Sequence, residues 1–218
     1  MSSLVVHCRL QPTDHLNDFS DWFLAASDLK AEALRILPIF AKTARSLSSQ
    51  FQTPLSVVVG YPYGHTAIEA KLAETVLALV EGVQEIVLYV NSIALVNNDW
   101  QLLAGELNTI AGFTGSKGCR LVVRLDASLL NDDLLRKACD LYGIAGIQAL
   151  WLDGISCEPE GLSQVRQARS FLADAVQLEV SSKITTITSA RSMLSSGAGI
   201  LALSDGLLIA DSLQTSPN

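Results

Sequence analysis

The sequence is poor in charged residues, which make up 17% of its 218 residues, whereas 49% are hydrophobic. A chain of this composition buries many segments from both sides, which favours an α/β fold over an antiparallel sheet with one solvated face. Basic residues are also scarce: 15 Lys and Arg against 22 Asp and Glu give a net charge of -7. An acidic surface argues against nucleic-acid binding, because phosphate contacts need clustered Lys and Arg.

No hydrophobic run reaches the roughly 18 residues of a membrane span, and the first residues lack the pattern of a signal peptide. Cysteines are few and scattered, with no CxxC pair and no His at ligand spacing. They are Cys8, Cys119, Cys139 and Cys157. This pattern indicates reduced thiols rather than a disulfide or zinc framework. We therefore expect a cytoplasmic protein with no membrane contact, no cofactor and no bound metal.

What the sequence does contain is a strand–loop–helix–strand unit between residues 55 and 95. Leu55–Val59 is a short, β-branched hydrophobic run typical of a strand buried on both faces. A glycine-rich loop follows, and Thr66 and Glu69 have the spacing of a capping box that begins a helix. The predicted buried face of that helix consists of Ile68, Leu72, Val76, Leu79 and Val80. Residues 85–90 then predict a second buried strand, which makes this a βαβ unit.

The same alternation extends along the whole chain. The other predicted strands are residues 4–10, 33–37, 120–125, 147–152, 176–180 and 200–203. Helices are predicted at residues 14–30, 39–48, 99–110, 131–142, 159–172 and 185–194, with a short one from residue 206. Strict alternation indicates parallel strands joined by crossover helices. Eight units predict a single-domain α/β fold, a (β/α)₈ TIM barrel over residues 1–213 with a polar tail at 214–218. An open doubly wound sheet is the alternative.

Two segments carry a resemblance to a known family. Residues 60–71, GYPYGHTAIEAK, and 85–100, EIVLYVNSIALVNNDW, are similar to motifs of the 2-deoxyribose-5-phosphate aldolases. Weaker matches lie at His7, at residues 129–138, at 197–198 and at Ser204 and Gly206. The resemblance implies a class I aldolase barrel, a carbon–carbon lyase that works through a Schiff base on lysine, and a homodimer.

The catalytic positions of the family are substituted in this sequence. Trp151 stands where the resemblance places the Schiff-base lysine, and Glu179 where it places the second lysine. Val87 and Val6 stand at the positions of two aspartates. A Schiff base needs an amine of lowered pKa and a proton shuttle, which these side chains do not supply. No residue is therefore assigned as catalytic.

The family's phosphate site is altered as well. The positions that the resemblance assigns to it are Ser181, Ser182, Lys183, Ser204 and Asp205. A carboxylate such as that of Asp205 repels an anion, and Lys183 offsets part of that repulsion. Lys183 is a candidate anion contact or relocated nucleophile, with a solvated loop lysine as the alternative.

Other polar and aromatic residues fall near predicted strand ends and are candidates for a ligand pocket. They are His7, Tyr61, His65, Asn91, Asp126, Trp151, Asp153 and Glu179. Carboxylates at 126, 153, 179 and 205 could together bind Mg²⁺ or Ca²⁺, but ordinary caps and loop carboxylates explain them as well. Trp151 is interpreted as a plug of the barrel or, alternatively, as a stacking platform. The alternative for His65 is that it only precedes the predicted Thr66 cap of the helix after the loop.

These observations predict an aldolase-like barrel that has lost Schiff-base catalysis, a pseudoenzyme that binds a small molecule or a protein partner. The first alternative is an enzyme of different chemistry at the same mouth, such as a metal-assisted lyase. The second is residual aldolase activity through Lys183. A fold alone does not decide among them.

Overall fold

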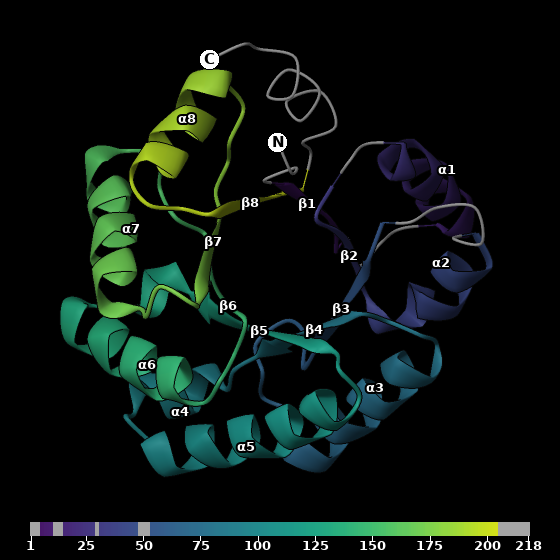
Figure 1. Cartoon of the computed structure of the whole chain (residues 1–218), viewed down its shortest axis with the longest axis horizontal. Coiled ribbons are helices and arrows are strands. Elements are labelled where there is room, and N and C mark those ends of the chain that lie inside the picture. The colour runs from purple at the N-terminus through teal and green to yellow at the C-terminus, as the bar shows by residue number, and fades with distance from the viewer. Residues whose placement is uncertain (1–4, 11–14, 29–30, 48–52, 205–218) are drawn as a thin grey trace.

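The computed structural model describes residues 5–10, 15–28, 31–47 and 53–204, which form a closed barrel of eight parallel strands (Figure 1). The strands follow one another in chain order, and β8 pairs with β1 to close the barrel. They are β1 (Val5–Arg9), β2 (Ala33–Ile36), β3 (Leu55–Val59), β4 (Glu85–Tyr89), β5 (Arg120–Asp126), β6 (Ala149–Asp153), β7 (Gln177–Ser181) and β8 (Ile200–Leu203). The predicted barrel is confirmed, and the open sheet is excluded.

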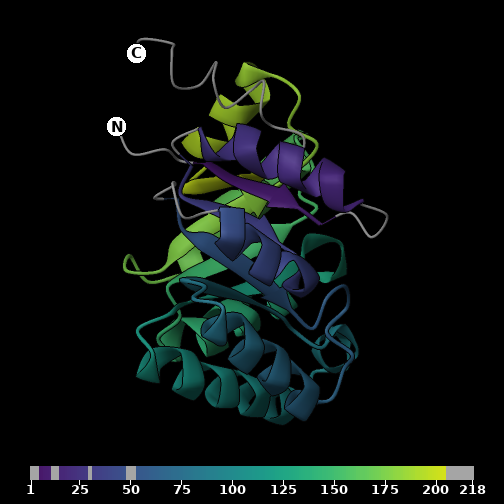
Figure 2. The same cartoon turned by 90° about the vertical axis from the view of Figure 1, so that its right-hand side faces the viewer.

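Helices form a ring outside the strands (Figures 1 and 2). They are α1 (Leu16–Ser27), α2 (Ala41–Leu47), α3 (Ile68–Val80), α4 (Ser92–Val96), α5 (Trp100–Ser116), α6 (Asp132–Ile144), α7 (Pro159–Phe171) and α8 (Ile187–Ser195). Short 3₁₀ turns lie at η1 (Pro38–Phe40) and η3 (Ala127–Leu129). In the described part of the chain, no helix combines the length and the apolar character that a membrane crossing requires. The helix predicted from residue 206 and the polar tail lie outside the described residues.

Hydrophobic side chains form two layers, one on each side of the strands. The inner layer fills the barrel with Val6, Ala33, Val58, Val87, Tyr89, Val122, Ala149, Trp151, Ile200 and Ala202. The larger outer layer lies between strands and helices. Strands such as β3 and β4 are buried along their whole length because alternate residues face the two layers. This explains why they read as continuous hydrophobic runs.

The helices after β3 and β4 differ from the prediction. In α3 the residue before the helix is Ala67, with no side-chain cap, so the predicted capping box does not form. Its buried positions are Lys71, Thr75 and Ala78, whereas Val80 is 67% exposed. The predicted face was therefore right for Ile68, Leu72 and Leu79, which pack against the core, but it missed the centre of the face, where a lysine paired with Glu106 is buried. Between β4 and α5 the chain also forms α4, which was not predicted.

Helix α5 continues to Ser116, past the point where glycines predicted its end. Its inner side chains, including Ile110 and Thr114, are buried against the barrel. Tertiary packing of this face outweighs the cost of the glycines, which is about 1 kcal/mol each relative to alanine.

Candidate functional site

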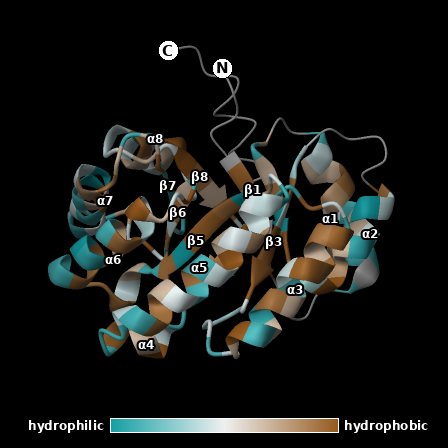
Figure 3. Ribbon diagram, turned by 60° about the horizontal axis from the view of Figure 1, so that its bottom comes forward, coloured by the Kyte–Doolittle hydropathy of each residue, from teal (hydrophilic) through white to brown (hydrophobic). Residues whose placement is uncertain are grey.

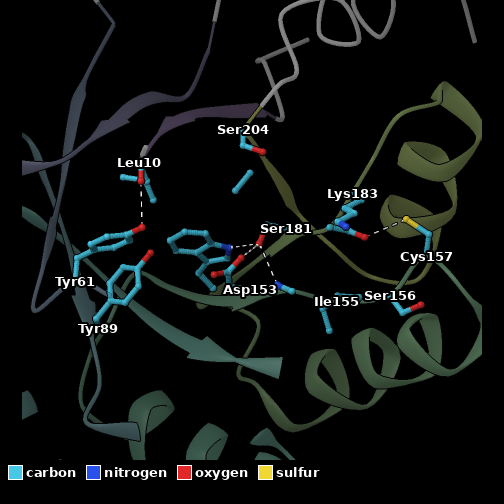
Figure 4. A pocket seen from close by; sticks show the side chains of 14 residues that line it. Leu10, Tyr61, Tyr89, Asp153, Ile155, Ser156, Cys157, Ser181, Lys183 and Ser204 are labelled. Atoms are coloured by element: carbon cyan, nitrogen blue, oxygen red, sulfur yellow. Dashed lines mark hydrogen bonds between the residues drawn. The ribbon is translucent and has the colours of Figure 1, made fainter. Parts of the chain in front are cut away.

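The carboxyl ends of the strands surround a cavity of about 620 Å³, called here the mouth cavity (Figure 4). Its apolar lining consists of Leu10, Tyr61, Tyr89, Trp151, Ile155 and Ala202. Its polar lining consists of Asp153, Ser156, Cys157, Ser181, Ser182, Lys183 and Ser204, with Gly154. In the view of Figure 4, Tyr61 and Tyr89 lie on the side opposite Lys183 and Cys157. Barrels of this kind carry their sites at this end.

Trp151 forms the floor of the mouth cavity. Its side chain points into the barrel and the residue is 2% exposed. The guanidinium carbon of Arg35 lies 4.5 Å from the indole centroid, and the ring of Tyr89 stands nearly perpendicular at 6.1 Å. The indole N–H donates to the Ser181 hydroxyl at 3.0 Å. With so little exposed surface, the indole is a plug rather than a stacking platform.

Neighbouring groups occupy all the hydrogen-bonding positions of the Ser181 hydroxyl. It accepts hydrogen bonds from the indole of Trp151 and from the backbone N–H of Gly154 at 3.4 Å, and it donates to Asp153 (Figure 4). A serine hydroxyl offers one donor and two lone pairs, so no lone pair remains for attack on a ligand. Ser181 therefore holds the cavity floor in one arrangement instead of serving as a nucleophile.

Arg124 neutralises two of the predicted mouth carboxylates. It donates to Asp153 Oδ2 through Nε at 3.0 Å and through Nη2 at 2.5 Å, and it contacts Asp126 at 3.3 Å. Burial acts to raise the pKa of Asp126, but hydrogen bonds from Ser128 and the charge of Arg124 outweigh it and lower that pKa. Asp126 also caps η3 and does not line the mouth cavity. The structure thus places Asp126 at the start of η3 and apart from the other predicted pocket residues.

A second arginine occupies the barrel below Trp151. Arg35 is fully buried and donates to Glu179, to Glu85 at 2.9 Å and to the Ser56 hydroxyl at 3.1 Å. Burial raises the pKa of Glu179, and the charge of Arg35 counteracts this. Glu179 therefore belongs to a buried network that joins β2, β3, β4 and β7, and it is not a residue of the cavity lining.

The predicted acidic mouth does not form as one cluster. Glu179 is paired with Arg35, while Asp153 and Asp126 share Arg124, and Asp205 lies outside the described residues. Within the described ranges no group of His, Cys, Asp and Glu side chains is arranged to hold a metal ion. Among the phosphate-site candidates, Ser181, Ser182, Lys183 and Ser204 do line the mouth cavity.

His65 and Asn91 lie away from the mouth cavity. Both line a separate hollow of about 380 Å³ between the start of α3 and α5. His65 Nε2 is 2.7 Å from the Ser92 hydroxyl, and the Asn91 side chain caps α4. The structure therefore does not bring them together with the residues of the mouth cavity. His7 lies in β1, but its side chain is outside the described part of the structure.

The segment of strongest family resemblance, residues 60–71, has a structural role. Gly64 has φ +71°, and a Cβ there would lie 2.0 Å from the Val90 carbonyl oxygen. Lys71 is fully buried and donates to the Tyr89 carbonyl at 3.0 Å and to Glu106 at 2.8 Å. Burial lowers the pKa of Lys71, and Glu106 opposes that effect. The motif thus fixes the loop after β3 against β4 and α5.

Cys157 is expected to be the reactive thiol among the three cysteines whose side chains are described. It is half-buried and lines the mouth cavity, whereas burial raises the pKa of Cys119 to about 11 and of Cys139 to about 12. At pH 8 roughly 1 in 1,000 or fewer of the Cys119 side chains is a thiolate, and burial also keeps the alkylating reagent from reaching the sulfur. Peptide mapping after brief iodoacetamide treatment should find Cys157 modified and these two intact. In urea all three should react. Equal modification of the three cysteines in the folded protein would contradict the burial of Cys119 and Cys139.

No family model matches the chain. Its sequence is 23% identical over 214 residues to the deoxyribose-phosphate aldolase of Metamycoplasma arthritidis, covering 98% of each chain. It is 25% identical over 206 residues to that of Aquifex aeolicus, covering 94% of this chain and 92% of the other. The solved deoxyribose phosphate aldolase of Aeropyrum pernix superposes with a TM-score of 0.87 at 21% identity, covering 98% and 91%. The chain is thus similar to these aldolases over almost its whole length and shares the fold of the solved one.

Proposed function

We propose that this protein is a member of the aldolase lineage that has lost Schiff-base catalysis and binds a small polar ligand in the mouth cavity. The observation that carries the proposal is Trp151, an inward-facing indole fixed at the position where the resemblance places the lysine nucleophile. The same resemblance places a lysine and an aspartate at Glu179 and Val87, which are a paired carboxylate and a core side chain.

The binding role is supported by what remains above Trp151. The mouth cavity, of about 620 Å³, has the size of ordinary small-molecule sites. Its floor is held by the Trp151–Ser181–Asp153–Arg124 chain of hydrogen bonds, so little order has to be gained when a ligand enters. Lys183 and the hydroxyls of Ser182 and Ser204 supply polar groups at the lining.

The loss of catalysis is tested by borohydride trapping with 2-deoxyribose 5-phosphate. We expect the intact mass of the protein to stay unchanged, whereas an active deoxyribose-phosphate aldolase treated in parallel gains the reduced adduct. The reason is that imine formation needs an unprotonated amine next to the bound carbonyl carbon. An adduct on the wild-type protein would contradict the proposal.

The binding role is tested by thermal unfolding in the presence of 2-deoxyribose 5-phosphate and related sugar phosphates. A ligand that binds only the folded chain raises the melting temperature in proportion to its occupancy. We expect a rise that Lys183→Ala reduces and that Lys137→Ala, an exposed change on α6, leaves unchanged. No rise with any of these compounds at saturating concentration would speak against a sugar phosphate site.

Lys183 supports a second candidate function, aldolase chemistry through a relocated amine, because it is an exposed lysine on the cavity lining. Mapping of a trapped adduct to Lys183 would favour this function over the non-catalytic one. The metal-assisted alternative has less support, since the predicted metal-binding carboxylates Asp126 and Asp153 are already paired with Arg124.

A further inference from the structure

A serine and a histidine lie within hydrogen-bond distance of each other where the loops after β3 and β4 meet. His65 Nε2 is 2.7 Å from the Ser92 hydroxyl oxygen, and neither residue lines the mouth cavity. A histidine at this distance activates a serine as a nucleophile when a further group orients the imidazole. Both residues follow the carboxyl ends of their strands, the end at which barrels of this kind carry their sites.

The backbone fixes these two side chains relative to each other. The Ser92 N–H donates to the Tyr63 carbonyl at 3.2 Å, and the Gly64 N–H donates to the Gly60 carbonyl at 2.8 Å. The ring of Tyr63 stacks on the imidazole of His65, with centroids 5.6 Å apart and planes inclined by 28°. The imidazole therefore has an orienting group, and the contact between histidine and serine joins two loops that are already bonded to each other.

His65 also lines the separate hollow of about 380 Å³, called here the side hollow. Figure 3 shows α3 and α5, which both contribute to its lining, side by side at the front of the molecule. The other lining residues are Thr66, Ala67, Ile68, Asn91, Leu102, Gly105, Glu106 and Thr109. The carboxylate among them, that of Glu106, is paired with Lys71. Such a lining, at the lower end of the size range of small-molecule sites, suits a short uncharged molecule.

Asn91 supplies a hydrogen-bond donor next to the serine. Its Oδ1 accepts from the Ala94 N–H at 3.0 Å and so caps α4. Because the oxygen is occupied in this way, the amide NH₂ is the part of the side chain that remains for a ligand, and it has no acceptor among the described residues. A side-chain amide beside a nucleophile is a donor of the kind that stabilises the oxyanion formed in acyl transfer.

We propose that Ser92 and His65 form a second site, independent of the mouth cavity, that hydrolyses short uncharged carboxylic esters whose acyl group enters the side hollow. With its own proton on Nδ1, His65 accepts the Ser92 hydroxyl proton on Nε2. Ser92 Oγ bonds to the ester carbonyl carbon, and the carbonyl electron pair moves to the oxygen beside the Asn91 amide. The bond to the alcohol then breaks, and the alcohol takes the proton from Nε2. Water repeats the sequence on the acyl serine, so one ester and one water give one acid and one alcohol.

Labelling of the full chain with diisopropyl fluorophosphate tests the nucleophile and its base. Intact mass should show one adduct, which peptide mapping places at Ser92, and Ser92→Ala should gain none. His65→Gln should slow labelling about 100-fold, because a general base contributes roughly 10²–10⁴ to such a step. His15→Gln, at an exposed histidine next to α1, should label at the wild-type rate. A wild-type protein without an adduct at Ser92, or an unchanged rate in His65→Gln, would overturn the proposal.

The donor role of Asn91 has a separate test that distinguishes it from capping. Asp caps a helix about as well as Asn, so Asn91→Asp keeps the cap of α4 and removes only the amide NH₂. With 4-nitrophenyl acetate as the probe, kcat should fall about 100-fold while the melting temperature stays near that of the wild type. Asn97→Asp adds the same charge at an exposed position after α4 and should keep the wild-type kcat. An unchanged kcat in Asn91→Asp, or an equal loss in both variants, would overturn the assignment of Asn91.

Discussion

Replacing Arg35 with methionine is expected to lower the free energy of unfolding by about 3–5 kcal/mol at pH 7, measured by urea denaturation. Arg35 and Glu179 are both fully buried, and the substitution leaves the Glu179 carboxylate without its cation. Glu85 loses one contact but keeps Ser56 at 2.6 Å and Arg120 at 3.4 Å. The loss therefore arises chiefly from one unpaired buried charge.

The matched control is the double variant Arg35→Met with Glu179→Met. It removes both charges and fills similar volume, so we expect it to recover most of the lost stability. A double variant as unstable as Arg35→Met alone would show that the loss comes from packing and not from the stranded carboxylate.

The loss in free energy of unfolding caused by Arg35→Met, called here the deficit, should also depend on pH in a defined direction. Burial raises the pKa of Glu179 in the folded protein, and removal of Arg35 raises it further. A raised carboxyl pKa stabilises the fold below its unfolded value, and this contribution is lost as pH rises through the folded pKa. The deficit should therefore be smaller at about pH 5 than at about pH 8. The opposite trend would contradict the assignment to Glu179.

The fold could be predicted because each strand is covered on both faces and so reads as a hydrophobic run. Leu55–Val59 and Ile200–Leu203 were predicted to the residue for that reason. The buried face of α3 could not be predicted in the same way. Lys71 is buried because Glu106, 35 residues later on another helix, pairs with it, and helical periodicity carries no information on such a partner.

The candidate site could be predicted only in part, for a similar reason. The resemblance to the aldolase motifs was sufficient to place Val87 and Trp151 at inward positions, and both side chains lie inside the barrel. It was not sufficient to show which carboxylates converge, because that depends on arginines from other strands. Arg35 interrupts a hydrophobic strand, and Arg124 alternates inward with Val122 in β5. A charged residue at an inward strand position was the available signal for both buried networks.

Replacing Trp151 with lysine is expected to give a borohydride-trapped adduct with 2-deoxyribose 5-phosphate where the wild-type protein gives none. The new amine would lie inside the barrel at the floor of the mouth cavity, and Arg35, whose guanidinium carbon is 4.5 Å from the present indole, would lower its pKa. In the imine step the amine adds to the carbonyl carbon and water leaves, and borohydride then reduces the C=N bond. Intact mass and peptide mapping would place the adduct at residue 151.

Trp151→Met is the matched control, since it also removes the indole but adds no amine. Both variants should lose about 3–5 kcal/mol of stability through the lost packing, so trapping is compared at a temperature at which both remain folded. We expect an adduct in Trp151→Lys only, and no cleavage of the sugar phosphate by it, because Val87 offers no proton shuttle. An adduct in both variants would place the reacting amine elsewhere, with Lys183 as the first residue to map. An adduct in neither would mean that the mouth cavity does not bring the carbonyl carbon to residue 151, and that the indole is not what keeps this barrel from Schiff-base chemistry.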